Sequence, residues 1–351
     1  MLMIVFGAGA SYGSRPERGL LDVPTPFEPV RPPLTGELLS EEHSAFAAKY
    51  PSSRPAIVAL QRALSEDPDL PIEAAIGDLY EASAGNLERA RHLLALRFYL
   101  CDLVETVSNE WWDRFHGFTH YTELLDRIST WRHETDEPVV MVTFNYDRLL
   151  DRTVEAQVGD WTLTDFQSYT SRRDWRLFKL HGSVGWSRVV KGWEGVDPEK
   201  PNDIIAQTGG VDFDRGELRP FPWLYAVDKG ETAVAAPGLA VPTTLKQRFQ
   251  CPTDHVDEFA SEVGRIDRLL TIGWRAAEPH VLELLAQNIP PGYHLAICDR
   301  SNDDIQAIWD NLGLAARRSP DPKAFTGGFT GLLEADHLEQ WLSLPAPGQP
   351  L

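Results

Sequence analysis

The chain has little cysteine, an excess of acidic over basic side chains, and no long apolar run. It contains 3 cysteines in 351 residues, and Cys101, Cys251 and Cys298 lie far apart with no Cys-x-x-Cys pair. This spacing indicates neither a disulfide framework nor a structural zinc module. No stretch approaches the ~20 apolar residues of a membrane span. We therefore expect a cytoplasmic protein that holds no metal and enters no membrane.

Basic side chains are scarce relative to acidic ones. The sequence has 33 Lys and Arg against 52 Asp and Glu, a net charge of -19. Nucleic acid binding depends on basic side chains that displace counterions from the phosphate backbone. The one modest basic group is Arg172, Arg173 and Arg176, which fits solvated residues that lead into a strand. We expect no direct nucleic acid partner.

A glycine-rich turn follows the first apolar segment. Residues 2–6 are apolar, and the chain then reads Gly7-x-Gly9-x-Ser11-x-Gly13. Small residues let backbone N–H groups close on phosphate oxygens, and a helix start adds a positive dipole. A secretory leader is the alternative, but the segment is short and lacks a positively charged start. The turn therefore favours a phosphate cradle.

This turn differs from the dehydrogenase fingerprint. The third glycine is not three residues after the second, and prolines recur from Pro16 to Pro33 where a dehydrogenase has its second strand. Proline removes backbone donors and is excluded from central strands. We therefore expect a loop to approach the ligand there.

Apolar runs alternate with helical patterns along most of the chain. The pattern predicts an α/β fold, a Rossmann-like parallel sheet with flanking helices, in a single domain over 1–351. Residues 35–135 form an inserted helical subdomain, 190–242 are rich in loops, and 344–351 are a flexible tail. The expected strands are Met3–Phe6, Val139–Phe144, Leu177–Leu180, Leu269–Ile272 and His294–Cys298. The expected helices are Ala56–Leu64, Ile72–Ser83, Leu87–Trp112, Tyr146–Ala156, Val256–Ile266, Glu278–Ala286 and Asp303–Leu312.

Polar residues stand where three of these strands end. Asn145 and Asp147 follow one strand, His181 follows the next, and Gly273 follows a third. Each has a simpler explanation: Asn145 caps a helix, Asp147 favours its first turn, and His181 is an ordinary core histidine. Ligands of parallel sheets lie at the carboxyl ends of the strands, however. Together with the glycine turn, the set indicates a binding site.

A metal site is a further alternative. His116 and His120 are four residues apart, with Asp113 beside them. Gly117 stands where a metalloprotease carries glutamate, and it weakens the helix that such a site needs. The pattern therefore does not favour metal.

Three blocks, taken in order, resemble a known signature. Gly7-Ala8-Gly9-Ala10-Ser11, Thr143-Phe144-Asn145-Tyr146-Asp147 and Lys179-Leu180-His181-Gly182-Ser183 resemble the sirtuin-like (silent information regulator) family. The resemblance is closer to its bacterial branch of anti-phage-defence NADases. Pro242–Lys246 and Leu270–Trp274 are similar to later blocks of that branch.

The resemblance implies a Rossmann-like core that binds NAD as a substrate. The implied NAD-binding residues are Gly7, Ala8, Gly9, Ala10, Ser11, Thr143, Gly182, Ser183, Gly273, Trp274 and Asp299. The glycine turn would hold the pyrophosphate, and Asp299 would reach the adenosine ribose. Asn145 would orient the nicotinamide ribose and the attacking water, Asp147 would lie near the carboxamide, and His181 would contact the ribose hydroxyls as general base.

Departures from the family narrow the activity. Sirtuin deacylases carry a four-cysteine zinc module that this chain cannot make, and Phe144 and Tyr146 replace their glutamine and isoleucine. The loop Gly273–His280 lacks the aspartate that often follows the corresponding block of the bacterial branch. The missing zinc module and the changes at Phe144 and Tyr146 favour an NAD glycohydrolase that releases nicotinamide and ADP-ribose, as an anti-phage effector that depletes cellular NAD. The loop departs from the bacterial branch itself and gives no support for this activity.

Other functions stay open from the sequence. One is an NAD- or ADP-ribose-binding regulatory module in a larger assembly, for instance with a HerA-type ATPase. A protein deacylase or ADP-ribosyltransferase is another. An effector that destroys NAD needs restraint, so we expect low basal activity with control by homo-oligomerisation or a partner defence protein. We also expect Asn145→Ala and His181→Ala to leave the glycine turn intact.

Overall fold

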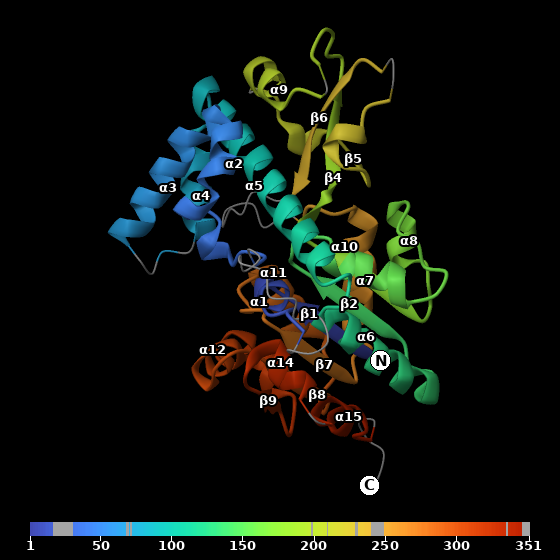
Figure 1. The fold of residues 1–351 in the computed structure, drawn as a ribbon. Helices are drawn as coiled ribbons and strands as arrows, with labels where there is room; N and C mark the ends of the chain where they lie inside the picture. The colour runs from blue at the N-terminus through green and yellow to red at the C-terminus, as the bar shows by residue number, and fades with distance from the viewer. Residues whose placement is uncertain are drawn as a thin grey trace.

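The structure is a computed structural model of the chain. It describes residues 1–16, 31–67, 70, 72–197, 199–208, 210–228, 231–239, 249–334 and 336–345. The block Pro242–Lys246, the end of the tail after 345 and most of the proline-rich stretch before Pro33 lie outside these residues. The elements form two regions, which occupy the lower and upper parts of Figure 1.

The lower region is built on a six-stranded parallel sheet. Its strands are β1 (Leu2–Phe6), β2 (Val139–Thr143), β3 (Trp175–Lys179), β7 (Arg268–Ile272), β8 (His294–Cys298) and β9 (Lys323–Phe325). Their order is β3-β2-β1-β7-β8-β9, and every neighbouring pair is parallel. The short apolar runs become the central strands because both faces of such a sheet are buried. The α/β class with a Rossmann-like parallel sheet is confirmed.

Helices flank this sheet. They are α1 (Ala8–Tyr12), α6 (His120–Thr135), α7 (Leu149–Gln157), α8 (Phe166–Thr170), α10 (Thr253–Val263), α11 (Pro279–Asn288), α12 (Asn302–Leu312), α13 (Leu314–Arg317), α14 (Gly328–Leu333) and α15 (His337–Leu342). By their contacts, α1, α6, α7, α14 and α15 form one group and α10 to α13 another. Two separate groups are what right-handed crossovers in both directions from β1 produce.

The upper region combines helices with a second sheet. It contains α2 (Ser44–Lys49), α3 (Arg54–Glu66), α4 (Ile72–Ala82), α5 (Leu87–Arg114), α9 (Pro201–Thr208), β4 (Gly182–Lys191), β5 (Glu217–Arg219) and β6 (Ala233–Leu239). The three strands are antiparallel in the order β5-β4-β6. Five short 3-10 helices, Thr35–Glu37, Glu41–His43, Pro51–Ser53, Phe213–Arg215 and Trp223–Tyr225, complete the two regions.

The prediction that residues 190–242 are rich in loops did not include the helix and strands that lie between those loops. The segment contains the end of β4 and all of α9, β5 and β6. Lys191 pairs with Ala233 and Gly182 with Leu239, so the partner strands are distant in sequence. Glycine, proline and aspartate are frequent in the connections, so the local sequence pattern does not predict the pairing of β4 with β6.

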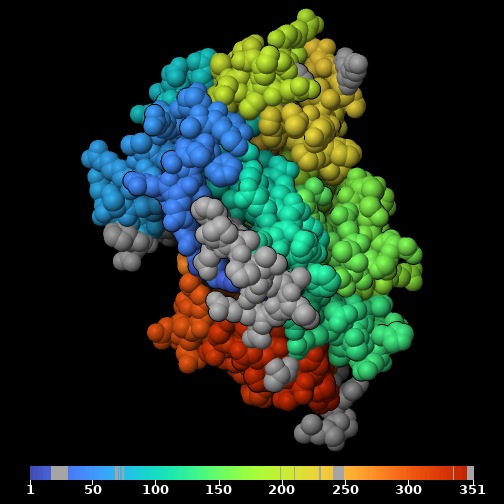
Figure 2. Space-filling view, in the orientation of Figure 1, coloured from blue at the N-terminus to red at the C-terminus, as the bar shows by residue number. Residues whose placement is uncertain are grey.

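The buried side chains form two main cores. One lies around the parallel sheet and includes Tyr121, Leu124 and Trp131 of α6. The other joins α2–α5 to β4, β6 and α9. Helix α5 spans both, with Leu93 to Val107 in the second core and Trp111 in the first. Figure 1 shows this helix running from the upper region to the lower one, and Figure 2 shows the same regions as a space-filling surface.

Candidate functional site

The strand order reverses at β1, which lies between β2 and β7. The residues that follow these strands meet there. Gly7 N–H donates to Ile272 O (3.1 Å), and Gly9 N–H donates to Gly273 O (3.1 Å). A Cβ on Gly9 would lie 2.8 Å from Gly273 Cα, and one on Gly273, at φ +56°, would lie 2.4 Å from Ala10 N. The two loops therefore interlock through bare backbone.

The glycine turn is partly committed to this interlock. Helix α1 begins at Ala8 and has only 5 residues, so its dipole is small. Ala10 N–H donates to Gly7 O at 2.9 Å, and Gly9 N–H is used by Gly273. Ala8 and Gly9 remain partly exposed, whereas Ala10 and Ser11 are buried. The turn presents small side chains and open backbone at Ala8 and Gly9.

A buried polar network is bonded to the turn. It consists of Ser11, Tyr121, Asn145 and Asp147. Asn145 Nδ2 donates to Gly7 O (2.9 Å) and to Ser11 Oγ (2.9 Å). Ser11 Oγ in turn donates to Asp147 Oδ2 at 2.7 Å and lies 2.9 Å from Tyr121 OH. This amide holds the Gly7 carbonyl, so the structure gives a reason to expect that Asn145→Ala loosens the turn, in place of the sequence-based expectation that the turn stays intact.

Asp147 also shapes the start of α7. Its Oδ1 accepts a hydrogen bond from Leu149 N (2.9 Å), which explains why α7 begins at Leu149 and not at Tyr146. Burial raises the pKa of Asp147, and the charge of Lys179 and the bond from Ser11 oppose that shift. The carboxyl group thus lies within the fold, with both oxygens bonded to protein groups.

Lys179 connects the polar network to the next strand. Its Nζ donates to Asp147 O (2.7 Å) and to Asp151 Oδ2 (2.7 Å), and both side chains of this ion pair are at most 1% exposed. Tyr169 OH adds a third bond, to Asp151 Oδ1 at 3.2 Å. A buried pair of this kind fixes the relative position of the β2 and β3 strand ends.

His181 lies in a different environment, which we call the histidine cluster: Phe144, His181, Phe249, Trp274 and His280. The His181 ring centroid is 4.9 Å from that of Phe144, which stacks on Trp274 at 5.4 Å. Among the residues that the structure describes, none hydrogen-bonds the His181 ring, which is partly exposed. Burial and the nearby His280 lower the pKa of His181 to about 4. The ring is therefore neutral at pH 7 and able to accept a proton.

His280 completes this cluster from the first turn of α11. Its ring centroid is 4.3 Å from that of Phe249. Both ring nitrogens are buried and have no hydrogen-bond partner in the described parts of the chain. Burial lowers the pKa of His280, so this ring is also neutral at pH 7.

The other predicted binding residues surround these two groups. Thr143 Oγ1 accepts a bond from Asn145 N (3.0 Å), and Ser183 Oγ accepts one from Gly185 N (3.2 Å), so both shape the backbone. Gly182 has φ +83°, and a Cβ there would lie 2.3 Å from Gly238 O. Trp274 Nε1 donates to Glu278 Oε2 at 2.6 Å. These side chains or backbones are held in place by contacts within the protein.

Asp299 lies apart from the rest, after β8. Its Oδ1 accepts a bond from Arg300 N (2.7 Å), and burial raises its pKa. Because β8 and β3 are on opposite sides of β1, Asp299 and His181 bracket the point where the strand order reverses. A ligand that touches both has to extend across β2, β1 and β7.

No group of three or more His, Cys, Asp or Glu suited to a metal occurs in the part of the chain that the structure describes. His116 has φ +50° in the turn after α5, whereas His120 lies in α6 with its Nε2 3.0 Å from Thr330 Oγ1. The two rings therefore do not share a helix face. The three cysteines are buried and unpaired. Within the described ranges, no helix has the length and apolar character needed to cross a bilayer.

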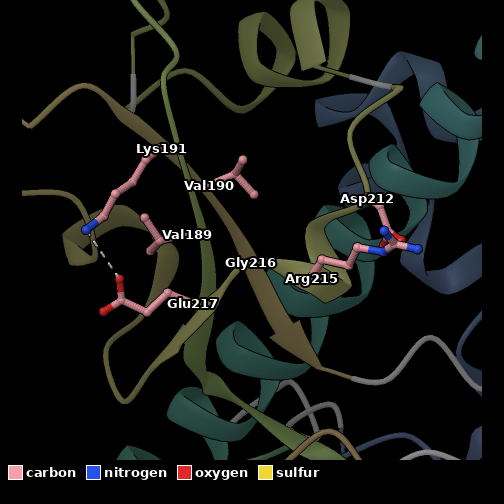
Figure 3. A pocket seen from close by; sticks show the side chains of 7 residues that line it. All are labelled: Val189, Val190, Lys191, Asp212, Arg215, Gly216 and Glu217. Carbon is pink, nitrogen blue, oxygen red and sulfur yellow. Dashed lines mark ion pairs between the residues drawn. The ribbon is translucent and has the colours of Figure 1, made fainter.

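A surface hollow lies elsewhere, at the end of β4 farthest from His181 (Figure 3). Its lining includes Lys191, Arg215, Asp212 and Glu217. Lys191 pairs with Glu217 at 3.8 Å and Arg215 with Asp212 at 3.2 Å. The charges of each pair cancel, so the hollow gives no argument for a charged ligand.

Comparisons with known proteins give structural matches only. No protein-family model and no curated protein matches the chain. A Sir2 homologue in complex with NAD is 14% identical, with a TM-score of 0.36 over 97% of this chain and 90% of the other. A Sir2 homologue mutant with 2'-O-acetyl ADP ribose is 15% identical, with a TM-score of 0.37 over 98% and 93%. A third, a mutant with ADP ribose, is 15% identical at a TM-score of 0.35 over 98% and 94%. At these scores the likeness adds no argument to the geometry above.

Sequence reasoning missed three residues of the site. Tyr121 is on α6, Lys179 ends β3, and His280 starts α11. Tyr121 has no local signal, because its partners are distant in sequence. A lysine in an apolar run, two residues before His181, was a usable signal for a buried ion pair. His280 follows Pro279 at a helix start, a pattern that reports the helix and not the site.

Proposed function

We propose that this chain binds NAD across the carboxyl ends of β1 and β7. The observation that carries the proposal is the strand order, which reverses at β1 between Gly7–Ser11 and Gly273. In doubly wound sheets, dinucleotides bind in the crevice at this switch point. The partly exposed backbone of Ala8 and Gly9 suits the pyrophosphate, and Asp299 suits the adenosine ribose. The span between Asp299 and His181 suits a dinucleotide better than a mononucleotide.

We further propose that the chain hydrolyses the bond between nicotinamide and ribose. Water adds to the ribose carbon, nicotinamide leaves with the bonding electrons, and His181 takes the proton of the water. This reaction builds positive charge on the ribose, so orientation and electrostatics matter more than a strong nucleophile. A neutral histidine that has no hydrogen-bond partner among the described residues is suited to the role of base.

The roles of Asn145 and Asp147 in this proposal are mainly positional. The Asn145 amide nitrogen is bonded to Gly7 O and Ser11 Oγ, and the Asp147 oxygens to Ser11 Oγ and Leu149 N. They hold the turn and the strand end against which the substrate rests. The lack of clustered cysteines, and Phe144 and Tyr146 in the sirtuin-like block, argue against protein deacylation. The proposed biological role is an anti-phage effector whose activity is controlled by homo-oligomerisation or a partner.

One observation favours a second candidate, a module that binds NAD or ADP-ribose without cleaving it. Because the Asn145 amide nitrogen is bonded within the protein, it has less freedom to orient a water. Such a module would serve a larger defence assembly.

Turnover of a fluorescent etheno-NAD analogue separates these candidates. We expect purified protein to release nicotinamide and etheno-ADP-ribose in equal amounts, without any acetyl-lysine peptide. The His181→Ala protein is the matched control and should bind the analogue without turnover. Binding with no turnover in the wild type would favour the binding module. Turnover only in the presence of an acetylated peptide would contradict NAD hydrolysis in favour of deacylation.

A further inference from the structure

The His280 ring is the one group of the histidine cluster whose polar atoms are buried and unused. Both its nitrogens lack a partner among the described residues, although the ring packs on Phe249. A buried imidazole nitrogen without a hydrogen bond is costly, because the desolvation of the polar group is not compensated. A ligand that supplies the missing hydrogen bonds would therefore gain binding free energy at this ring.

The position of His280 limits what that ligand can be. The ring packs on Phe249, and the next residue, Gln250, donates its N–H to Leu180 O (3.0 Å), so the ring lies near the strand end that carries His181. Phe144 connects the two sides of the cluster, with contacts to His181 and, through stacking, to Trp274. His280 therefore serves the half of the site around β2 and β3, away from Asp299 beyond β8.

A sugar hydroxyl is the partner that fits a neutral imidazole. Neutral histidine offers one N–H donor and one nitrogen acceptor, and a hydroxyl offers both functions in return. A carboxylate or phosphate can only accept hydrogen bonds, so it could bond the N–H of a neutral ring but would leave the other nitrogen without a donor. The aromatic walls from Phe144 and Trp274 suit the carbon face of a sugar or a planar ring.

We propose that His280 is a substrate-contacting residue that binds a hydroxyl of the ribose whose glycosidic bond is cleaved. The inference rests on the proposed function, since it takes the nicotinamide ribose to lie beside His181. It assigns to His280 a binding role that is separate from proton transfer. The adenosine half of the substrate makes no contact with this ring.

Two product-like probes test the assignment without turnover. ADP-ribose carries the second ribose and ADP lacks it, so the difference in their dissociation constants isolates the contact. We expect His280→Phe to weaken ADP-ribose about threefold to tenfold, the effect of one hydrogen bond, and to leave ADP unchanged. His280→Gln keeps a donor and an acceptor and should restore part of the affinity. His337→Phe, at an exposed histidine ring that also lies against a phenylalanine, is the control and should change neither constant.

The outcomes separate this inference from the proposed function. Equal weakening of ADP-ribose and ADP in His280→Phe, or no weakening of either, would overturn the role of His280. Wild-type protein that binds ADP-ribose no tighter than ADP would also overturn it. If His280→Phe weakens ADP-ribose more than ADP but the wild-type protein releases no nicotinamide from NAD, the His280 contact is supported. In that case only the proposed hydrolysis is contradicted. If His280→Phe does not fold, His280→Ala also removes both ring nitrogens and provides the same comparison of ADP-ribose with ADP.

Discussion

The polar network and the histidine cluster lie on neighbouring strand ends but meet their hydrogen-bonding needs in opposite ways. In the network, Ser11 Oγ and the Asp147 oxygens bind one another or nearby backbone groups. In the cluster, His181 and His280 make no hydrogen bond to the described residues, and aromatic rings provide their contacts. The first arrangement fixes backbone geometry, and the second leaves polar atoms for a ligand. Substitutions should therefore affect stability in the network and activity in the cluster.

Replacement of one residue from each group gives the largest contrast. His181→Ala should lower NAD turnover by about 10²–10⁴-fold, the usual loss of a general base, with little change in melting temperature. Asn145→Ala should also lower turnover but should reduce the free energy of unfolding by about 1–3 kcal/mol, because Gly7 O and Ser11 Oγ lose a donor. Initial rates and urea unfolding of both proteins check this. Equal stability losses in the two variants would contradict the distinction.

Lys179→Met tests the buried extension of the network. Removal of the ammonium leaves Asp151 buried and uncompensated, so the free energy of unfolding should fall by about 3–5 kcal/mol. Chemical denaturation measures this loss. Lys191→Met is the control, because its partner Glu217 is exposed and such pairs contribute about 0–1 kcal/mol. A loss no greater than that of the control would mean that the Lys179–Asp151 pair does not hold the strand ends.

The acid limb of the pH profile sharpens the description of His181. Its pKa is about 4 in the folded chain, below the ordinary 6.5, so the neutral base persists as the pH falls through 6.5. We expect kcat/KM for NAD to stay level from pH 8 to about 5 and to fall near pH 4. A midpoint near 6.5 would show that the ring is solvated and not enclosed by Phe144.

The same shift has a stability counterpart with a definite sign. The unfolded histidine binds a proton near pH 6.5 and the folded one only near pH 4, so the unfolded state holds more protons in between. The free energy of unfolding should therefore decrease as the pH falls from 6.5 toward 4. His120, whose pKa burial also lowers to about 4, adds to this decrease. Denaturant unfolding across this window provides the control for the rate measurements.

The smallest effect concerns the loop that carries Trp274 into the cluster. Ala276 has φ +52°, a left-handed conformation in which a Cβ is unfavourable. Ala276→Gly should raise the free energy of unfolding by up to about 1 kcal/mol, because the relief of strain exceeds the entropy cost of glycine. Ala277→Gly, where φ is not positive, should lower it instead. A loss of stability in Ala276→Gly would mean that its Cβ packing outweighs the backbone strain.

The sequence predicted the parallel sheet well because its signals are local. Met3–Phe6, Val139–Phe144 and Leu269–Ile272 are apolar runs that end at glycine or polar residues, and each matches a strand within a residue or two. The antiparallel sheet was missed because β4 and β6 pair over a long sequence separation, through segments rich in glycine and proline. Local sequence patterns predict single helices and strands, whereas these strands are stabilised by pairing with segments distant in sequence.

The site shows the same division. Residues directly after strands, such as Asn145 and His181, could be selected because the carboxyl ends of parallel strands converge. The hydrogen-bond partners of each side chain could not be predicted from the sequence. Asn145 is bonded to the turn, whereas His181 is not. Tyr121 and His280 reach the site from helices, so no strand-end rule selects them.

The close packing of Gly7, Gly9 and Gly273 gives these glycines a structural role that does not depend on a nucleotide. Their backbones lie so close that a side chain at one would meet the main chain of another. In a library randomised at these three positions and selected only for folding, glycine should be recovered at all of them together, with no nucleotide present. The glycines of the turn are therefore required by the close packing of two loops, whether or not a nucleotide binds. Nucleotide affinity has to be tested by substitutions at residues outside this packing.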